Sequence, residues 1–263
     1  MFDIKLIKER LKNMKLASEL CDMATTNDQK LLNYVSSTGD VFILGEFDHT
    51  ISQHVVPALR ALIDEKAKER DAFITIYINS NGGYTHELYN LLSLIELAHA
   101  RGVGIVTVVT GRAYSCGSML AIHGDHRVMY KYASHIIHLG RQGALDISTE
   151  KQIKRETTQM ENHFNNIRKL YKEHTKLPAK ELEEALTDDS YFLTAEECVK
   201  YGLCDEILGY TEEEMDALID SFKKEKESSK KSKETKKKTE KKTEKKTSKK
   251  KEKEILLENK ESE

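Results

Sequence analysis

Two apolar, largely β-branched runs, each followed at once by a turn of small residues and a helical pattern, limit most strongly how this chain can fold. Phe73–Ile78 leads into Asn79–Gly83, and Val103–Thr110 leads into Gly111–Gly117. Such runs are typical of strands covered on both faces, and their alternation with helices predicts parallel strands joined by right-handed crossovers. Because function gathers at the carboxyl ends of such strands, both turns are expected at one functional edge.

Ser115 lies in the second turn and is the candidate nucleophile. A serine at a strand-to-helix turn can expose its hydroxyl next to the unpaired backbone N–H groups of the helix start, where an oxyanion can be held. Small residues at such a junction also serve close packing, so the stretch alone leaves both interpretations open. Gly82 and Gly83 in the first turn either let a substrate approach the backbone closely or form an ordinary turn.

The charge is distributed unevenly along the 263 residues. The net charge is −2, but residues 223–263 contain 18 Lys and 10 Glu, so the residues before them carry a net charge of −10. The Lys/Glu-rich segment has almost nothing apolar to bury and is predicted to be disordered, as an interaction tail or as a solubilising extension. The acidic body argues against specific nucleic-acid binding.

The cysteines and the apolar segments indicate where the chain functions. Cys21, Cys116, Cys198 and Cys204 show neither a CxxC pair nor the spacing of a disulfide framework or zinc site. No stretch approaches the roughly 20 apolar residues of a membrane span, and the N-terminus lacks the apolar core of a signal peptide. We therefore expect free thiols, no metal, no cofactor, no membrane partner and a cytoplasmic location.

Four segments are expected along the chain. Residues 1–38 carry apolar positions at helical spacing and predict an N-terminal helical segment, which is followed by the main domain at 39–210. A short acidic helix is predicted at 211–222, and the disordered tail at 223–263.

Several helices and strands of the main domain can be predicted from the sequence. Val41–Leu44 predicts a buried strand, Ile51–Arg70 a helix capped by Thr50, and Thr85–His99 a second helix. Ile147–Lys172 predicts a long polar helix, whose sparse apolar face would suit an oligomer contact or packing within one subunit. That face consists of Ile153, Met160, Phe164, Ile167 and Leu170.

Five stretches carry a family resemblance in the same order. Tyr77-Ile-Asn-Ser-Asn-Gly-Gly83 is similar to Tyr-Ile-Asn-Ser-Pro-Gly-Gly, and Gly111-Arg-Ala-Tyr-Ser-Cys-Gly117 to Gly-x-Ala-x-Ser-Met-Gly, both of them signatures of ClpP, the proteolytic subunit of the Clp proteases. Further similar stretches are Phe42–Glu46, Ser134–His138 and Phe192–Glu206. Ordered motifs together are far more specific than any one of them.

The resemblance implies an α/β fold, the ClpP/crotonase-type spiral of βαβ units with a long handle helix. It also implies a serine endopeptidase that hydrolyses peptide bonds of unfolded polypeptides or short peptides inside an oligomeric chamber, by a Ser-His-Asp mechanism. Such an enzyme assembles with itself, as one ring or as two stacked rings, and can receive substrate from an AAA+ unfoldase. The Lys/Glu-rich tail would also fit a phage or mobile-element relative.

By resemblance, His138 is the base that takes the proton of Ser115, with His135 and His123 as weaker alternatives. Histidine suits this role because its pKa lies near neutrality. The third member of the triad is a carboxylate that orients the histidine. Alignment from the two sides of its segment differs by one residue, which favours Asp189 and leaves Asp188 as the alternative.

The oxyanion hole implied by the resemblance is the pair of backbone N–H groups of Gly83 and Cys116. The chain departs from the family pattern at Cys116, where methionine is usual, at Asn81, where the glycine turn has proline, and at Leu139-Gly140, which replaces Gln-Pro. The changes at Asn81 and at Leu139-Gly140 border the expected substrate edge, and Cys116 stands beside the candidate nucleophile. The alternatives are a catalytically silent ring or scaffold subunit, a phage capsid-processing protease and, less favoured, a crotonase-type acyl-CoA enzyme, which needs no Ser-His pair.

Overall fold

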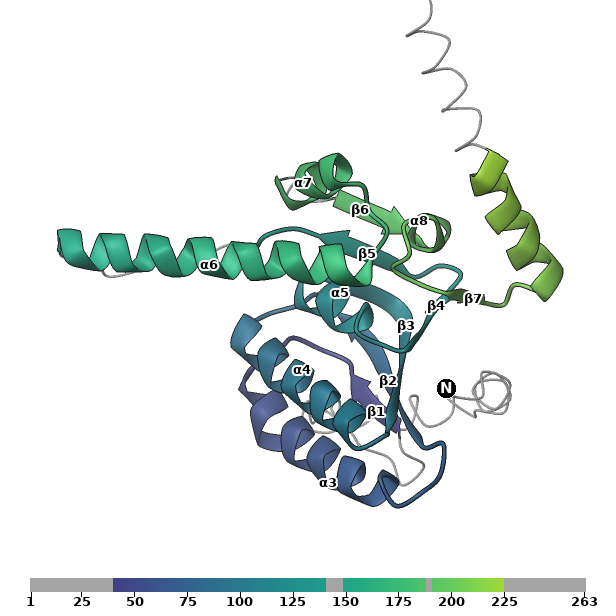
Figure 1. Cartoon of the computed structure of the whole chain (residues 1–263), viewed down its shortest axis with the longest axis horizontal. Helices are drawn as coiled ribbons and strands as arrows, with labels where there is room; N and C mark the ends of the chain where they lie inside the picture. The colour runs from purple at the N-terminus through teal and green to yellow at the C-terminus, as the bar shows by residue number, and fades with distance from the viewer. Residues whose placement is uncertain (1–39, 141–148, 188–190, 225–263) are drawn as a thin grey trace, which may run out of the picture. The chain divides into compact units, whose positions relative to one another are not determined.

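The computed structural model describes residues 40–140, 149–187 and 191–224 (Figure 1). Within these residues a seven-stranded sheet forms the centre of the fold, and five of its strands follow one another in parallel. In spatial order these are β1 (Asp40–Ile43), β2 (Phe73–Ser80), β3 (Gly104–Tyr114), β4 (His126–Tyr130) and β7 (Glu206–Leu208). The predicted α/β architecture with parallel strands is confirmed.

Strand β3 takes part in two arms of the sheet. Its first half pairs with β2 and β4, whereas its last residues, Arg112–Tyr114, pair in parallel with β5 (Ser134–Ile137). Strand β5 in turn pairs in antiparallel fashion with β6 (Tyr191–Thr194). The end of β3 is therefore held between the glycine turn that follows β2 and the strand that precedes His138.

One face of the sheet is covered by helices that come from the crossovers. They are a π-helical turn at Ile51–Val55 and the helices α3 (Val56–Lys66), α4 (Thr85–Ala100) and α5 (Cys116–Ala121) (Figure 1). The hydroxyl of Thr107 donates to the carbonyl of Ala121 at 2.6 Å, which identifies the helix-facing side of β3. Ile76 lies beside Thr107 in register and is buried on that same side.

The opposite face of the sheet carries a second apolar cluster, made of Phe42, Phe73, Tyr77, Val106, Val108 and Val128. Phe42 and Tyr77 stack with their ring centroids 5.0 Å apart. Burying one such side chain contributes about 1.5–3 kcal/mol. Alternate residues of β2 and β3 thus point to opposite apolar layers, which is why their sequences read as continuous apolar runs.

The helix predicted at Ile51–Arg70 ends at Lys66, and its predicted cap is wrong. The backbone N–H and the hydroxyl of Thr50 both donate to Oδ1 of Asp48, at 2.9 and 2.6 Å, and the Thr50 side chain accepts no helix N–H. Asp48 therefore organises this turn, because its carboxylate accepts local N–H and O–H groups more strongly than a hydroxyl does.

The long polar helix predicted at Ile147–Lys172 is α6 (Glu150–His174); residues 147 and 148 lie outside the described residues. Thr149 and Gln152 form a reciprocal capping box at its start. In Figure 1 its first half extends past the other elements, and burial within α6 is confined to Ile167 and Tyr171 in its second half.

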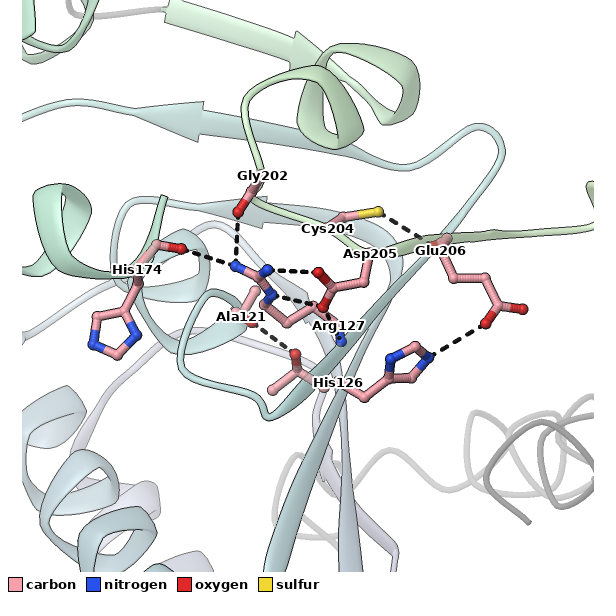
Figure 2. Close-up of polar contacts among 9 residues, drawn as sticks. Ala121, His126, Arg127, His174, Gly202, Cys204, Asp205 and Glu206 are labelled. Carbon is pink, nitrogen blue, oxygen red and sulfur yellow. Dashed lines mark hydrogen bonds and ion pairs between the residues drawn. The ribbon is translucent and has the colours of Figure 1, made fainter. Parts of the chain in front are cut away.

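Arg127 on β4 joins three segments that are distant in sequence (Figure 2). Its Nε and Nη2 donate to the carboxylate of Asp205 at 2.9 and 2.6 Å, and its Nη1 donates to the carbonyls of His174 and Gly202 at 2.8 and 2.7 Å. A bidentate guanidinium–carboxylate pair is among the stronger polar contacts in proteins. Through these contacts Arg127 holds the end of α6 and the segment that precedes β7 against the sheet.

The remaining described helices are α7 (Ala179–Thr187), α8 (Ala195–Lys200) and a helix at 212–224, which belongs to a separate compact unit. Among the described residues, no helix combines the length and hydrophobicity that crossing a bilayer requires. The N-terminal segment at 1–38 lies outside the described residues, as does the tail from residue 225, so the structures expected there stay predictions.

Candidate active site

Ser115 occupies a strained turn between β3 and α5. Its backbone adopts φ 53° and ψ −118°, a conformation that non-glycine residues rarely take and that costs on the order of 1–3 kcal/mol. The N–H of Ser115 donates to the carbonyl of Ile136 at 3.0 Å, and its carbonyl accepts from the N–H of Met119 at 3.1 Å. These two bonds hold the turn between β5 and the body of α5.

The glycine turn after β2 packs directly against the serine turn. A Cβ on Gly82 would lie 2.6 Å from Cβ of Ser115, and one on Gly83 would lie 2.5 Å from the carbonyl oxygen of Phe47. Both glycines also have positive φ, 96° and 147°. Only glycine fits at either position, because both the positive φ and the close approach of the neighbouring backbone exclude a side chain.

Phe47 fixes the direction of the peptide groups in the glycine turn. Its N–H donates to the carbonyl of Gly82 at 2.8 Å, and its carbonyl accepts from the N–H of Tyr84 at 2.7 Å. In a planar trans peptide the C=O and the next N–H point in opposite directions. Since the Gly82 carbonyl points toward Phe47, the N–H of Gly83 points away from it.

Cys116 connects the two turns through its side chain. Its buried Sγ donates to the carbonyl oxygen of Gly83 at 3.2 Å, and burial raises the pKa of the thiol to about 11. The thiol therefore stays protonated at neutral pH, which is inconsistent with a reactive thiolate. Its backbone N–H lies at the start of α5, next to Gly82, so the two candidate oxyanion donors belong to turns in contact with each other.

A cavity of about 550 Å³ opens beside Ser115. His138, at the end of β5, lines the same cavity as Ser115 and Gly83. Thus three of the residues predicted from sequence border one space. The complete set of described lining residues is Asn81, Gly83, Tyr84, Thr85, Ser115, Met119, His138, Leu139, Gly140, Gln159, Met160, His163, Phe164 and Ile167.

The two weaker candidates for the base lie elsewhere. His135 is fully buried, with Nδ1 3.0 Å from the hydroxyl of Ser118, and burial lowers its pKa to about 3. The ring of His123 packs 4.0 Å from that of His174, and burial lowers its pKa to about 4. Neither is among the described residues that line the cavity. An imidazole whose pKa lies this far below physiological pH binds a proton too weakly to act as the general base for a serine.

Asp188 and Asp189 lie outside the described residues, but the chain is described on both sides of them. On one side, the carbonyl of Leu186 accepts from the N–H of Leu139 at 3.3 Å. On the other side, Tyr191 pairs with Ile137. The described residues that flank the two aspartates in sequence are therefore hydrogen-bonded or paired to the neighbours of His138.

Sequence reasoning missed a group of cavity residues on α6. Gln159, Met160, His163, Phe164 and Ile167 share one face of the helix and line the cavity. Met160, Phe164 and Ile167 belong to the sparse apolar face whose sequence suits an oligomer contact or packing within one subunit. The spacing of Met160, Phe164 and Ile167 predicts that apolar face, but the spacing does not indicate that the face borders Ser115.

Comparison with known proteins identifies the family of this chain. The family described as Clp protease matches residues 24–211, which is most of the chain. The ATP-dependent Clp protease proteolytic subunit of Deinococcus radiodurans is 28% identical over 176 residues, covering 66% of this chain and 81% of that protein. The matched region contains the sheet, both turns and the cavity, and the chain belongs to the Clp protease family.

Proposed function

We propose that this protein is a serine endopeptidase in which Ser115 is the nucleophile and His138 the general base. The observation that carries the proposal is that Ser115, held at positive φ in a strand-to-helix turn, borders the same cavity as His138. The N–H of Ser115 also donates to Ile136, two residues before His138, so one strand positions both groups.

The mechanism follows from these positions. His138 accepts the proton of the Ser115 hydroxyl as its oxygen attacks the peptide carbonyl, because a neutral hydroxyl is a weak nucleophile. The N–H groups of Gly83 and Cys116 stabilise the negative charge that develops on the carbonyl oxygen. His138 then returns the proton to the leaving amine, and water hydrolyses the acyl-enzyme by the same route.

Asp189 is our choice for the carboxylate that orients His138 and stabilises its protonated form. Support comes from the described neighbours of the Asp188–Asp189 pair, since Leu186 and Tyr191 contact residues on either side of His138. Comparing Asp189→Ala and Asp188→Ala separately tests this choice. Full activity in both variants would refute the assignment.

Members of this family form oligomeric rings and are often associated with ATPase partners. For this chain we propose a homo-oligomeric ring in the cytoplasm that encloses the cavities and admits unfolded polypeptides or short peptides. The sequence contains no G-x-x-x-x-G-K-[ST] motif, so an ATP-dependent activity would require a separate unfoldase.

The decisive experiment measures whether Ser115 reacts. The purified oligomer is treated with a fluorophosphonate probe and, in parallel, with a fluorogenic peptide. We expect labelling and cleavage that are lost in Ser115→Ala, reduced at least 10²-fold in His138→Ala, and kept in Ser93→Ala, a matched control on the exposed side of α4. An assembled oligomer without Ser115-dependent labelling would instead support a catalytically silent ring subunit.

A further inference from the structure

The cavity beside Ser115 has a largely apolar lining, and α6 contributes part of it. Its aliphatic, thioether and phenyl lining comes from Met119, Leu139, Met160, Phe164 and Ile167. Among the described lining residues none is Asp, Glu, Lys or Arg. A charged substrate side chain that entered this space would therefore lose its hydration without gaining an opposite charge, which is unfavourable.

His163 is one of two polar side chains that α6 contributes to this lining, the other being Gln159, and a contact with α4 fixes the position of His163. The hydroxyl of Tyr89 lies 3.1 Å from Nδ1 of His163, and the two rings meet edge to face with centroids 6.2 Å apart. Burial lowers the pKa of His163 and raises that of Tyr89, so both groups are neutral at pH 7. The imidazole is thus an oriented, uncharged hydrogen-bonding group at the edge of the cavity.

The second ring nitrogen of His163, Nε2, has no hydrogen-bond partner among the described residues. If the Tyr89 hydroxyl donates to Nδ1, Nε2 carries the proton and donates; if Nδ1 donates to the hydroxyl, Nε2 accepts. A carboxamide can meet either state, because its carbonyl accepts and its NH₂ group donates. An apolar side chain can meet neither.

We propose that His163, held by Tyr89, is a specificity-determining residue that selects a carboxamide side chain, glutamine above all, on the substrate residue whose carbonyl Ser115 attacks. This inference rests on the proposed function and deepens it by naming the substrate class. The unbranched glutamine side chain can pass the apolar lining and place its terminal amide at His163. Methionine has a similar length without the amide, and glutamate has the same shape with a charge.

The test uses three peptides that differ only at that residue, which is Gln, Met or Glu. With the wild-type oligomer at pH 7.5 we expect kcat/KM for the Gln peptide to exceed that for the Met peptide about threefold to tenfold, as one good hydrogen bond predicts. The Glu peptide should be at least about tenfold poorer than the Gln peptide, because its charge is unpaired.

Two variants change this preference, and a third is the matched control. His163→Leu should bring the Gln/Met ratio to about one, and Tyr89→Phe should lower the ratio at least about twofold by releasing the imidazole. His54→Leu, at an exposed histidine outside the cavity lining, should leave the ratio unchanged. General damage to the fold lowers both rates together and leaves their ratio intact, so the ratio isolates recognition.

The outcomes separate this inference from the proposed function. A wild-type Gln/Met ratio near one, or a ratio that His163→Leu leaves unchanged, overturns the inference while fluorophosphonate labelling of Ser115 still supports the peptidase. Loss of labelling in His163→Leu as severe as in His138→Ala also overturns it, because His163 would then act in the chemistry. No Ser115-dependent labelling in the wild-type protein removes the proposed function itself.

Discussion

The hydroxyl of Ser118 and Nδ1 of His135 lie 3.0 Å apart and form a fully buried serine–histidine pair. Ser118 follows Ser115 by three residues on α5, and His135 precedes His138 by three residues. The same two segments thus carry one pair that borders the cavity and one that is sealed in the core. Burial sets His135 apart from His138, since the buried imidazole of His135 cannot accept a proton without leaving an unpaired charge in an apolar site.

The inner pair should make stability depend on pH. Burial lowers the pKa of His135 to about 3, whereas the unfolded chain binds the same proton near pH 6.5. The unfolded state therefore holds more protons between these values, and stability falls as the pH drops below about 6.5, by up to roughly 1.4 kcal/mol per pH unit. Urea unfolding at pH 7.5, 5.5 and 4.5 measures this slope.

The matched variant for this prediction is His135→Gln, which keeps a polar side chain without a group that titrates in this range. Its stability should fall less steeply with pH than that of the wild type, although His123, with a pKa lowered to about 4, contributes a similar slope to both proteins. Parallel slopes in the two proteins would show that His135 is not the titrating group.

Arg127 is expected to be irreplaceable by lysine. Its guanidinium reaches Asp205 in a bidentate pair and donates to two carbonyls besides, an arrangement that a single ammonium cannot reproduce (Figure 2). We expect Arg127→Lys to lower the free energy of unfolding by about 1–3 kcal/mol, because the partly buried carbonyls of His174 and Gly202 lose a charged donor. Urea titration followed by circular dichroism measures the loss; a wild-type midpoint would contradict it.

Alanine at the glycine turn should remove activity. In Gly83→Ala the new Cβ would lie 2.5 Å from the backbone of Phe47 at a φ of 147°, so the turn must shift and take the N–H of Gly83 with it. We expect at least about a 10²-fold loss of peptide cleavage, the usual effect of losing one oxyanion donor. Gly45→Ala is the control, since nothing lies within 4 Å of its Cβ position. Equal activity of the two variants would exclude this role for the turn.

The thiol of Cys116 should be inert but structurally useful. With its pKa raised to about 11 and its side chain buried, we expect no alkylation by iodoacetamide in the folded protein at pH 8, measured by mass spectrometry of the peptide that contains Cys116.

Removing the thiol tests its contact with Gly83. Cys116→Ala should lower kcat about threefold to tenfold with little change in KM, because the contact to the Gly83 carbonyl holds the glycine turn. Cys116→Ser, which keeps a donor, should recover part of this loss. Rapid alkylation of the wild type, or a purely KM effect in Cys116→Ala, would contradict this account.

The parts of the fold that local sequence determines were predictable. The runs of β2 and β3 and the glycines after β2 identify the strands and the two turns, since each depends on nearby residues alone. Ordered motifs single out Ser115 and His138 as candidates, and the structure places both at one cavity. Thr50 does not cap the helix as predicted, because the side chains of Thr50 and Asp48 compete for the same turn and the carboxylate of Asp48 prevails.

Contacts between distant elements could not be predicted in the same way. His163 borders the cavity because α6 packs where Tyr89 of α4 can reach it, and no local pattern encodes that crossing. Nor does a local pattern reveal that β3 pairs with β4 along its middle and with β5 at its end. The one-residue insertion near Asp189 likewise leaves sequence alignment undecided between two adjacent carboxylates.

The pairing of β5 has a consequence for how activity can be turned off. Ser115 is bonded to Ile136, the segment before Asp188 is bonded to Leu139, and His138 lies between these two contacts. The candidate nucleophile, the candidate base and the stretch that carries the candidate acid are therefore all held by β5 and the two residues that follow it. Displacing that strand would separate all of them at once. Inactivation should therefore be all-or-none: fully active and fully inactive molecules would coexist, and the activity of each molecule would not decline gradually.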